Sequence, residues 1–359
     1  MNRVLPTLAL LGAALTAVGA IVDVDAFLRA WLVAALVALA LPLGTLPILM
    51  THSLTGGRWG EPLRGPLNAV AATLPWALVL FIPLLLGAPE LFRWADAPHT
   101  LPELVRAKRF YLNLPFFYAR FALYALIWVV LAFRLRVFRG DAPPSTATCA
   151  AGLVLWTLTT TYFAYDWLMA LEPTWYSDVV GLIFIGSILS MALALPFLLP
   201  GVFPNADQAE RSDSGRIMEG ARRDVAHLWL TLILFWVFVA FSQYLIIWSG
   251  DLPHEIRWYL HRQRGGWQWL ALAMMLLCGL IPFLGLLGHR WKRRARPLAV
   301  LAALVLLGHV LEFAWLVLPT YYPEGWVWGW RSPVALLTVL SMLAWLWRRR
   351  QPRAMEVTP

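Results

Sequence analysis

Long apolar runs follow one another along this chain, separated by short polar breaks. Ten of them read as membrane helices, which need about 20 largely apolar residues each. Segments of alternating polarity, which transmembrane β-strands require, do not dominate anywhere. The pattern therefore predicts an all-α, polytopic membrane protein, a single integral membrane unit over residues 1–359. We place the spans at 5–22, 27–50, 66–88, 112–138, 149–171, 179–203, 225–249, 268–289, 297–320 and 332–347.

Counting divides the ten spans into two four-helix bundles with one peripheral helix outside each. Spans 2–5, residues 27–171, form the first bundle, and spans 6–9, residues 179–320, form the second. Several spans contain proline, which membrane helices tolerate when neighbouring helices satisfy the freed backbone groups. We expect interruptions at Pro42, Pro47, Pro75, Pro83 and Pro196.

Composition supports the membrane assignment, and the position of charge predicts the topology. The chain is 60% apolar and 14% charged, with a net charge of +9. With ten spans both termini lie on one side, and that side carries most of the Lys and Arg outside the spans. The positive-inside rule then places both termini in the cytoplasm. Basic runs such as Arg290–Arg296 and Arg348–Arg350 are interpreted as contacts with membrane lipid, with nucleic-acid binding as the weaker alternative.

The first apolar run also has features of a cleavable signal peptide. Arg3 precedes it, and small residues occur around Val18–Ala20. The run is long for the apolar region of a signal peptide, so we favour a membrane span. Cleavage would leave the topology of the other nine spans unchanged.

Two connecting segments are long enough to have structure of their own. Residues 204–224 are polar, lie on the cytoplasmic side, and are expected to be a flexible linker or a partner contact. Residues 250–267 lie on the opposite side and predict a short helix, capped by Asp251 and ended by Gly265–Gly266. We expect His254, Glu255 and His261 of this segment to lie on a face in contact with water.

Span 5 contains Asp166, and Glu172 lies at its outer end. A charged, unpaired carboxylate inside a membrane costs several kcal/mol, so Asp166 is a candidate functional residue. Thr159, Tyr162 and Asp166 are three and four residues apart, which places them on one helix face. Such a face suits a proton relay. The alternative, that Asp166 only accepts hydrogen bonds between helices, stays open.

Span 9 contains His309 and Glu312, again three residues apart and deep in the span. Buried His and Glu side chains mark proton routes in membrane proteins, although the pair could also be a packing element. Arg120 in span 4 is expected to pair with a carboxylate, for which Asp166 and Glu312 are the candidates; the alternative is that it snorkels outward along its own helix. His227, at the inner end of span 7, is a further relay candidate, and an interface histidine is the alternative.

We expect no redox cofactor and no metal in this chain. Cys149 and Cys278 are far apart and have no metal-ligand spacing, which excludes an iron–sulfur cluster held by this chain alone. No two histidines face each other at a similar depth, so bis-histidine haem ligation is not expected. A quinone pocket near the aromatic outer ends of spans 5 and 7 is kept as an alternative.

Several stretches together resemble one family. They are GPLNAVAATLPWALVLFIPLLLG (65–87), KRFYLNLPFFYARFALYALIW (108–128), FAYDWLMALEPTWYSDVVGLIF (163–184), FSQYLIIWSGDLPHEIRWYLHR (241–262) and residues 309–319. They are similar to the smaller polysulfide-reductase-type (NrfD-like) membrane subunit of alternative complex III, often labelled ActF or quinone-binding subunit 2. That complex is a bacterial quinol:cytochrome c, or quinol:oxidase, oxidoreductase. The resemblance covers about residues 60–330.

The resemblance implies a ten-helix, multi-pass protein of the bacterial cytoplasmic membrane that has no redox centre of its own. It implies as partners a sister polysulfide-reductase-type membrane subunit, an iron–sulfur subunit and haem c subunits. It also implies that this subunit supplies part of a proton path. By motif position, Asp166 and Glu172 come from the YDW…LEP block and Arg120 from the PFF…R block, while His309 and Glu312 are matched by span alone.

Two other functions compete with a role in a respiratory complex. An independent secondary transporter would also contain intramembrane charges and broken helices, and it predicts inverted-repeat symmetry. A purely structural membrane anchor would use the same charges only to hold its helices together. The expected enzymatic role in the first case is that of a non-catalytic subunit of a quinol-oxidising complex.

Overall fold

A computed structural model of the chain describes residues 4–96, 101–135, 137, 144–203, 213–292, 294–326 and 329–350. Within these ranges all regular secondary structure is helical and no strand occurs. Nine helical segments in the described ranges are long and apolar enough to cross a membrane. The structure therefore confirms an all-α, polytopic membrane protein.

The longer helices follow the predicted spans, with short helices in the connections. The α-helices are α1 (Val4–Val22), α2 (Val24–Thr55), α3 (Glu61–Ala71), α4 (Leu74–Val79), α5 (Ile82–Leu86), α6 (Ala88–Leu91), α7 (Glu103–Ala107), α8 (Leu114–Arg134), α9 (Thr146–Trp167), α10 (Val180–Ala194), α12 (Asp213–Gly250), α13 (Pro253–His261), α14 (Trp267–Met275), α15 (Ile281–Leu287), α16 (His289–Lys292), α17 (Ala295–Val317) and α18 (Arg331–Arg350). The 3₁₀ helices are η1 (Arg93–Ala95), η3 (Met169–Leu171), η4 (Leu195–Phe197) and η6 (Leu318–Thr320), and η5 (Leu276–Leu280) is a π-helical segment.

The tenth predicted span, 332–347, forms helix α18 but is not among the nine apolar helices, because its ends carry four arginines. It packs antiparallel along α1. Gly19 of α1 lies against Arg331 and Gly12 against Thr338, where an added methyl group would overlap the threonine. Since α1 and α18 run side by side, α18 extends across the molecule over the same distance as α1. The first described residues of α1 and the last described residues of α18 therefore lie at the same end of the molecule.

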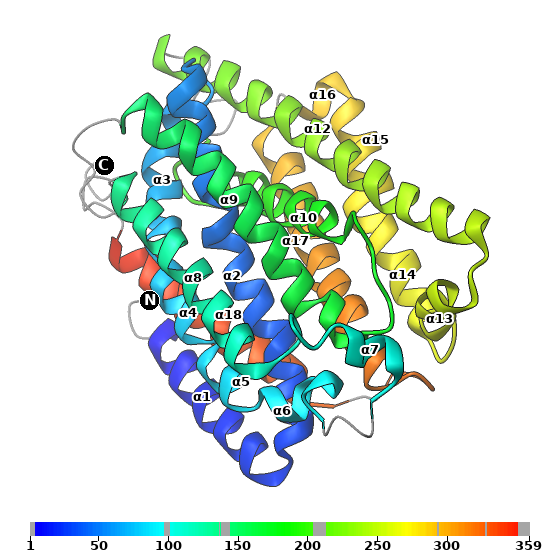
Figure 1. Cartoon of the computed structure of the whole chain (residues 1–359). Helices are drawn as coiled ribbons and strands as arrows, with labels where there is room; N and C mark the ends of the chain where they lie inside the picture. Colours follow the sequence, from blue (N-terminus) through cyan, green and yellow to red (C-terminus); the bar gives the residue numbers. More distant parts are fainter. Residues whose placement is uncertain are drawn as a thin grey trace.

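Helix α2 lies at the centre of the molecule, against α1, α3, α9, α10, α17 and α18 (Figure 1). The expected interruptions at Pro42 and Pro47 are wrong, because α2 continues through both as a helix of 32 residues. Pro47 has no N–H for the carbonyl of Leu43, and the indole N–H of Trp156 donates to that carbonyl instead, at 3.0 Å. A neighbouring helix therefore satisfies the backbone group that the proline leaves free.

Other spans are interrupted. The third is divided into α3, α4 and α5, with Pro75 and Pro83 in the first turns of the last two. Trp31 of α2 donates to the carbonyl of Leu80 between α4 and α5, at 2.7 Å. Span 6 ends in η4, which contains Pro196. Span 8 consists of α14, the π-helical segment η5 and α15.

Helix α12 extends well beyond its predicted span. It has 38 residues, or about 57 Å at 1.5 Å per residue, and so exceeds the hydrocarbon thickness of a membrane. The expectation of a flexible linker over 204–224 is thus wrong for residues 213–224, which are helical; residues 204–212 lie outside the described ranges. The helix between α12 and α14 exists as α13, but Leu252 rather than Asp251 is its N-cap residue.

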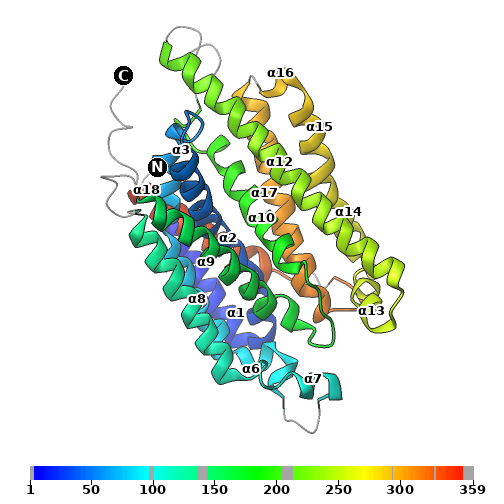
Figure 2. The same ribbon diagram turned by 45° about the horizontal axis from the view of Figure 1, so that its top comes forward.

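The connections lie at two ends of the molecule (Figure 2). We call one the α13 end; it holds α6, α7, η3, α13 and η6. The opposite end, the terminal end, holds the first residues of α1 and the last of α18. Helix α10 packs against α2 and α9 as well as against α12 and α17, so the helices of the two proposed bundles form one packed body. The cytoplasmic position of the terminal end stays a prediction from the charge distribution.

Candidate functional site

Asp166 of α9 is paired with Arg120 of α8 in the interior of the molecule. The guanidinium donates from Nε to Oδ2 at 2.9 Å and from Nη2 to Oδ1 at 2.8 Å. Tyr124, one turn further along α8, donates its hydroxyl to Oδ2 at 2.9 Å. Asp166 is 1% exposed and Arg120 6%. The carboxylate therefore has three donors, two of them from a permanent cation, which is the strong bidentate geometry.

The third nitrogen of the Arg120 guanidinium, and the flat faces of that group, also have partners. Its Nη1 donates to the carbonyl of Tyr111 at 2.8 Å, and its guanidinium lies 3.8 Å from the centre of the Tyr111 ring and 4.5 Å from that of Phe116. Burial, together with the charge of Asp166, raises the pKa of Tyr111. The local sequence builds this arrangement, because the Asn113 side chain caps α8 by accepting from the N–H of Phe116.

Thr159 lies on the buried face of α9 with Asp166, but Tyr162 does not. Trp128 of α8 donates to the hydroxyl of Thr159, which in turn donates to the carbonyl of Leu155. Tyr162 is 47% exposed and its ring lies against Tyr165. The tyrosine that reaches Asp166 comes from α8 instead. The spacing of Arg120 and Tyr124, four residues apart on one helix face, is the sequence signal that could have identified it.

His309 and Glu312 of α17 form a second buried cluster. His309 Nδ1 lies 2.6 Å from Glu312 Oε2, and the two residues are 1% and 2% exposed. Glu312 Oε1 accepts from Trp236 Nε1 of α12 at 2.8 Å and from Ser187 Oγ of α10 at 3.0 Å. The ring of Trp236 also meets that of His309 edge to face. Three side chains, from α10, α12 and α17, therefore meet around the Glu312 carboxylate.

The charge of this second cluster is not fixed by its partners. In the salt bridges of the described residues, the partner of Glu312 is His309, which is charged only when protonated. The indole of Trp236 and the hydroxyl of Ser187 are neutral donors. His309 Nε2 is buried and has no hydrogen-bond partner among the described residues. The pair can hold one proton on either residue, since a neutral histidine beside a protonated glutamate and an ion pair contain the same number of protons.

The π-helical segment η5 packs directly against this part of α17. Cys278 of η5 donates to the carbonyl of Val305 at 3.7 Å and touches Gly308, where an added methyl group would overlap the sulfur. Glycine at 308 thus permits the close approach of η5 to the turn that precedes His309. π-Helical turns are frequent at functional sites, and this one lies beside the pair.

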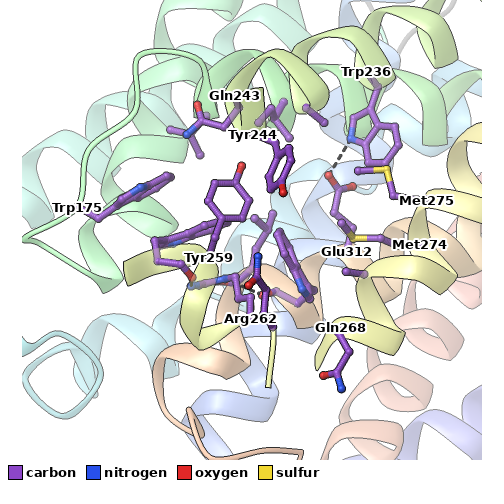
Figure 3. Close-up of a pocket in the computed structure, with 18 residues that line it drawn as sticks. Trp175, Trp236, Gln243, Tyr244, Tyr259, Arg262, Gln268, Met274, Met275 and Glu312 are labelled. Atoms are coloured by element: carbon purple, nitrogen blue, oxygen red, sulfur yellow. Dashed lines mark hydrogen bonds between the residues drawn. The ribbon is translucent and has the colours of Figure 1, made fainter. Parts of the chain in front are cut away.

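Glu312 also lines a cavity of about 220 Å³ between α10, α12, α13, α14 and α17. Figure 3 shows the side chains of Tyr244, Tyr259 and Glu312 directed into one space, with the Trp236–Glu312 hydrogen bond at its edge. Gln263 and Gln268, both exposed, line the cavity at the α13 end. The cavity therefore extends from the surface of the α13 end to the buried carboxylate.

Glu172 lies in a third cluster, where it meets a residue that the sequence analysis missed. Arg262, at the end of α13, is 1% exposed and donates to Glu172 Oε1 at 2.8 Å. Thr320 donates to the same oxygen at 2.9 Å, and His261 Nδ1 lies 3.7 Å from Oε2. Glu172 thus links η3, α13 and η6, and it is not part of the Asp166 cluster.

Arg262 is held by backbone groups as well as by Glu172. It donates to the carbonyls of Trp315 and Leu316 at the end of α17 and to that of Trp258, and its guanidinium stacks on the Trp258 ring at 3.6 Å. Burial lowers the pKa of Arg262, and Glu172 opposes this shift. Apart from Trp258, its partners are 53 to 90 residues away in sequence, so residue spacing could not identify them.

His227 lies on an exposed face of α12, nine residues or about 13 Å along the helix from Trp236. The structure therefore does not bring it to the His309–Glu312 pair.

Cys149 and Cys278 are both buried and free. The part of the chain that the structure describes has no group of three or more His, Cys, Asp or Glu side chains that could hold a metal ion. Comparison with models of protein families finds no match for the chain, and comparison with curated proteins finds none either.

Proposed function

We propose that this chain is a membrane subunit of a bacterial respiratory quinol:cytochrome c or quinol:oxidase oxidoreductase, and that it conducts protons through His309 and Glu312. The assignment to this complex, and to the bacterial cytoplasmic membrane, is supported by the five stretches of sequence named above. The all-α membrane architecture agrees with it. In this proposal the chain carries no redox centre, and electrons move through the iron–sulfur and haem c subunits that are its partners.

The observation that carries the proton-conducting role is the position of Glu312. It is a buried carboxylate that pairs with no permanent cation among the described residues, it is hydrogen-bonded to a histidine, and it lines a cavity that reaches the surface. Imidazole and carboxylate side chains exchange protons near neutral pH when burial and neighbours adjust them. Ionisable groups inside membrane spans mark proton pathways for this reason.

The other candidate residues have positioning roles in this proposal. Protonation of Asp166 would leave the guanidinium of Arg120 as an unpaired charge in the interior, which is strongly unfavourable. Glu172 is similarly tied to Arg262. Thr159 holds Trp128, while Tyr162 and His227 point to the periphery. The Arg120–Asp166 pair therefore joins α8 to α9, and the Glu172–Arg262 pair joins η3 to α13 and α17.

The test is Glu312→Gln in the purified complex reconstituted into proteoliposomes. The amide still accepts hydrogen bonds but cannot carry a proton, so quinol oxidation should continue while proton movement across the membrane falls at least about tenfold. Glu61→Gln, at an exposed position in α3, is the matched control and should change neither rate. Unchanged proton movement in Glu312→Gln would refute the proton-conducting role.

Copurification tests the assignment to a complex. A respiratory subunit should leave a mild detergent extract together with haem c-containing partners and a second polysulfide-reductase-type membrane subunit, whereas an independent transporter should leave alone. The absence of haem c from the purified material would contradict the proposed complex.

A quinone site is the second candidate function, and the aromatic walls of the cavity favour it. Trp175, Tyr244, Tyr259 and Trp315 provide ring surfaces, and Gln243 provides an amide, in a space of about 220 Å³. Ligand pockets commonly combine apolar walls with a few polar groups in this way. Photolabelling with an azido-quinone should then modify residues of α12 or α13; labelling confined to partner subunits would exclude this function.

A further inference from the structure

A groove of about 350 Å³ lies at the α13 end, between the segment that leads into α8 and the segment that follows α9. Lys108 is the one charged residue among the described residues that line it. The rest of the lining is aromatic or aliphatic and includes Phe110, Tyr165 and Met169. Apolar side chains therefore dominate the groove, and an apolar ligand that displaces water from them is stabilised there.

Lys108 brings a half-buried positive charge to this groove. Its ammonium donates to the carbonyl of Pro173 at 3.0 Å and lies 5.6 Å from the centre of the Tyr176 ring. Both of these partners are neutral, and burial lowers the pKa of Lys108. The segment 103–111 has three basic residues and one acidic residue, so it adds to the positive charge. An ammonium has three donors, of which the carbonyl uses one, so the groove favours a ligand that has a negative group.

The groove continues into an exposed apolar stripe along α9. Tyr165 lines the groove, and its ring meets that of Tyr162, which is 47% exposed. Leu158 and Leu155 follow at helical spacing on the same face and are 52% and 43% exposed. The stripe over residues 155–165 is about 15 Å long, or half of the ~30 Å hydrocarbon thickness of a membrane. It therefore has the depth of one leaflet.

The position of the groove along the spans agrees with the surface of a membrane. Asn113 caps the start of α8, and α9 ends at Trp167, so the groove lies where one membrane helix begins and another ends. Phe110, beside Lys108 in the lining, is 82% exposed. Exposed aromatic rings next to basic residues are typical of the boundary between headgroups and hydrocarbon.

We propose that this groove binds an anionic phospholipid, with the phosphate at Lys108 and one acyl chain in the groove and along the stripe over residues 155–165. The phosphate supplies a negative charge beside an ammonium whose described partners are neutral. The acyl chain covers apolar rings. A lipid fits better than an extended segment of a partner protein, because peptide groups placed against the stripe would have no water to bond. The site is separate from Glu312 and does not depend on the proton-conducting role.

The test compares two photoactivatable lipids on the wild-type protein, purified with its partners. Both carry a diazirine on one acyl chain, and the headgroup is phosphatidylglycerol in one and the net-neutral phosphatidylcholine in the other. Each is a minor component of phosphatidylcholine vesicles, and labelled residues are mapped by peptide mass spectrometry. We expect the anionic lipid to label residues 155–176 about fivefold more, the effect of roughly one basic residue near an anionic headgroup. Equal labelling by the two lipids, or no labelling there because a partner protein covers the groove, would overturn the proposal.

Substitutions at Lys108 assign the preference to one residue. Lys108→Gln keeps a donor for the carbonyl of Pro173 but removes the charge, so the preference for the anionic lipid should disappear, whereas Lys108→Arg should retain it. Arg257→Gln, at an exposed position of α13 outside the groove, is the matched control and should retain it too. An unchanged preference in Lys108→Gln, or an equal loss in Arg257→Gln, would refute the site. If Lys108→Gln does not assemble, the comparison of the two lipids on the wild-type protein still decides.

Discussion

The two buried carboxylates in the membrane interior, Asp166 on α9 and Glu312 on α17, are held by equal numbers of donors but by donors of different charge. Asp166 accepts two hydrogen bonds from the permanent cation Arg120 and one from Tyr124. Glu312 is bonded to a neutral indole, a hydroxyl and an imidazole whose charge can change. Burial and hydrogen-bond count are therefore alike at the two carboxylates. Under the proposed function, the permanence of the partner's charge distinguishes the positioning role of Asp166 from the proton-carrying role of Glu312.

Neutralising Asp166 should have the largest effect on stability. Asp166→Asn leaves the guanidinium of Arg120 buried and unpaired, at a cost of about 3–5 kcal/mol. We expect a lower yield of the assembled complex and a lower thermal midpoint, measured by size-exclusion fluorescence on heating. If Asp166→Asn instead assembles normally and loses only proton movement, Asp166 is a carrier and the comparison fails.

Removing the Tyr124 hydroxyl should have an intermediate effect. Tyr124→Phe takes one donor from a buried carboxylate, and hydrogen bonds to charged groups contribute about 1.5–3 kcal/mol. The matched control is Tyr162→Phe, because Tyr162 was expected to share the face of Asp166 and lies at the periphery instead. It should be nearly neutral in the same thermal assay, and a larger loss in Tyr162→Phe than in Tyr124→Phe would contradict the placement of both rings.

Neutralising Glu312 should have the smallest effect on stability. Glu312→Gln is the same chemical change as Asp166→Asn, yet it leaves no cation unpaired, and the amide oxygen can still accept from Trp236 and Ser187. We expect a loss of about 1 kcal/mol or less, together with the loss of proton movement described above. A loss equal to that of Asp166→Asn would show that Glu312 also pairs with a permanent charge.

Much of the difference between the two carboxylates could be predicted from the sequence, because a buried charge is costly and so must find one of a few possible partners. Arg120 in an apolar span was expected to pair with a carboxylate rather than to snorkel outward, and Asp166 was one of two candidates. The three-residue spacing of His309 and Glu312 placed both on one helix face. The membrane spans followed from apolar length alone, and the structure confirms the fold class that they predicted.

The rest depended on how helices rotate and pack, which one-dimensional spacing does not specify. Tyr162 satisfies the three-and-four spacing with Asp166, but the rotation of α9 turns it outward. Pro47 leaves α2 unbroken because Trp156, more than one hundred residues later, satisfies the freed carbonyl. Arg262 was unpredictable for the same reason, since its partners come from three distant segments. Local sequence therefore predicts which groups need partners, and packing decides which partners they find.

The antiparallel contact between α1 and α18 has a consequence for the time course of biogenesis. Gly12 is synthesised 326 residues before Thr338, its neighbour in the folded protein. At about 5–20 residues per second, the glycine face of α1 stays uncovered for tens of seconds while the rest of the chain is inserted. Completion of α18 is thus the step that closes the molecule. If translation stops before α18 is made, the released protein leaves the Gly12 and Gly19 face of α1 uncovered. Quality-control proteases can then recognise that face before any partner subunit binds.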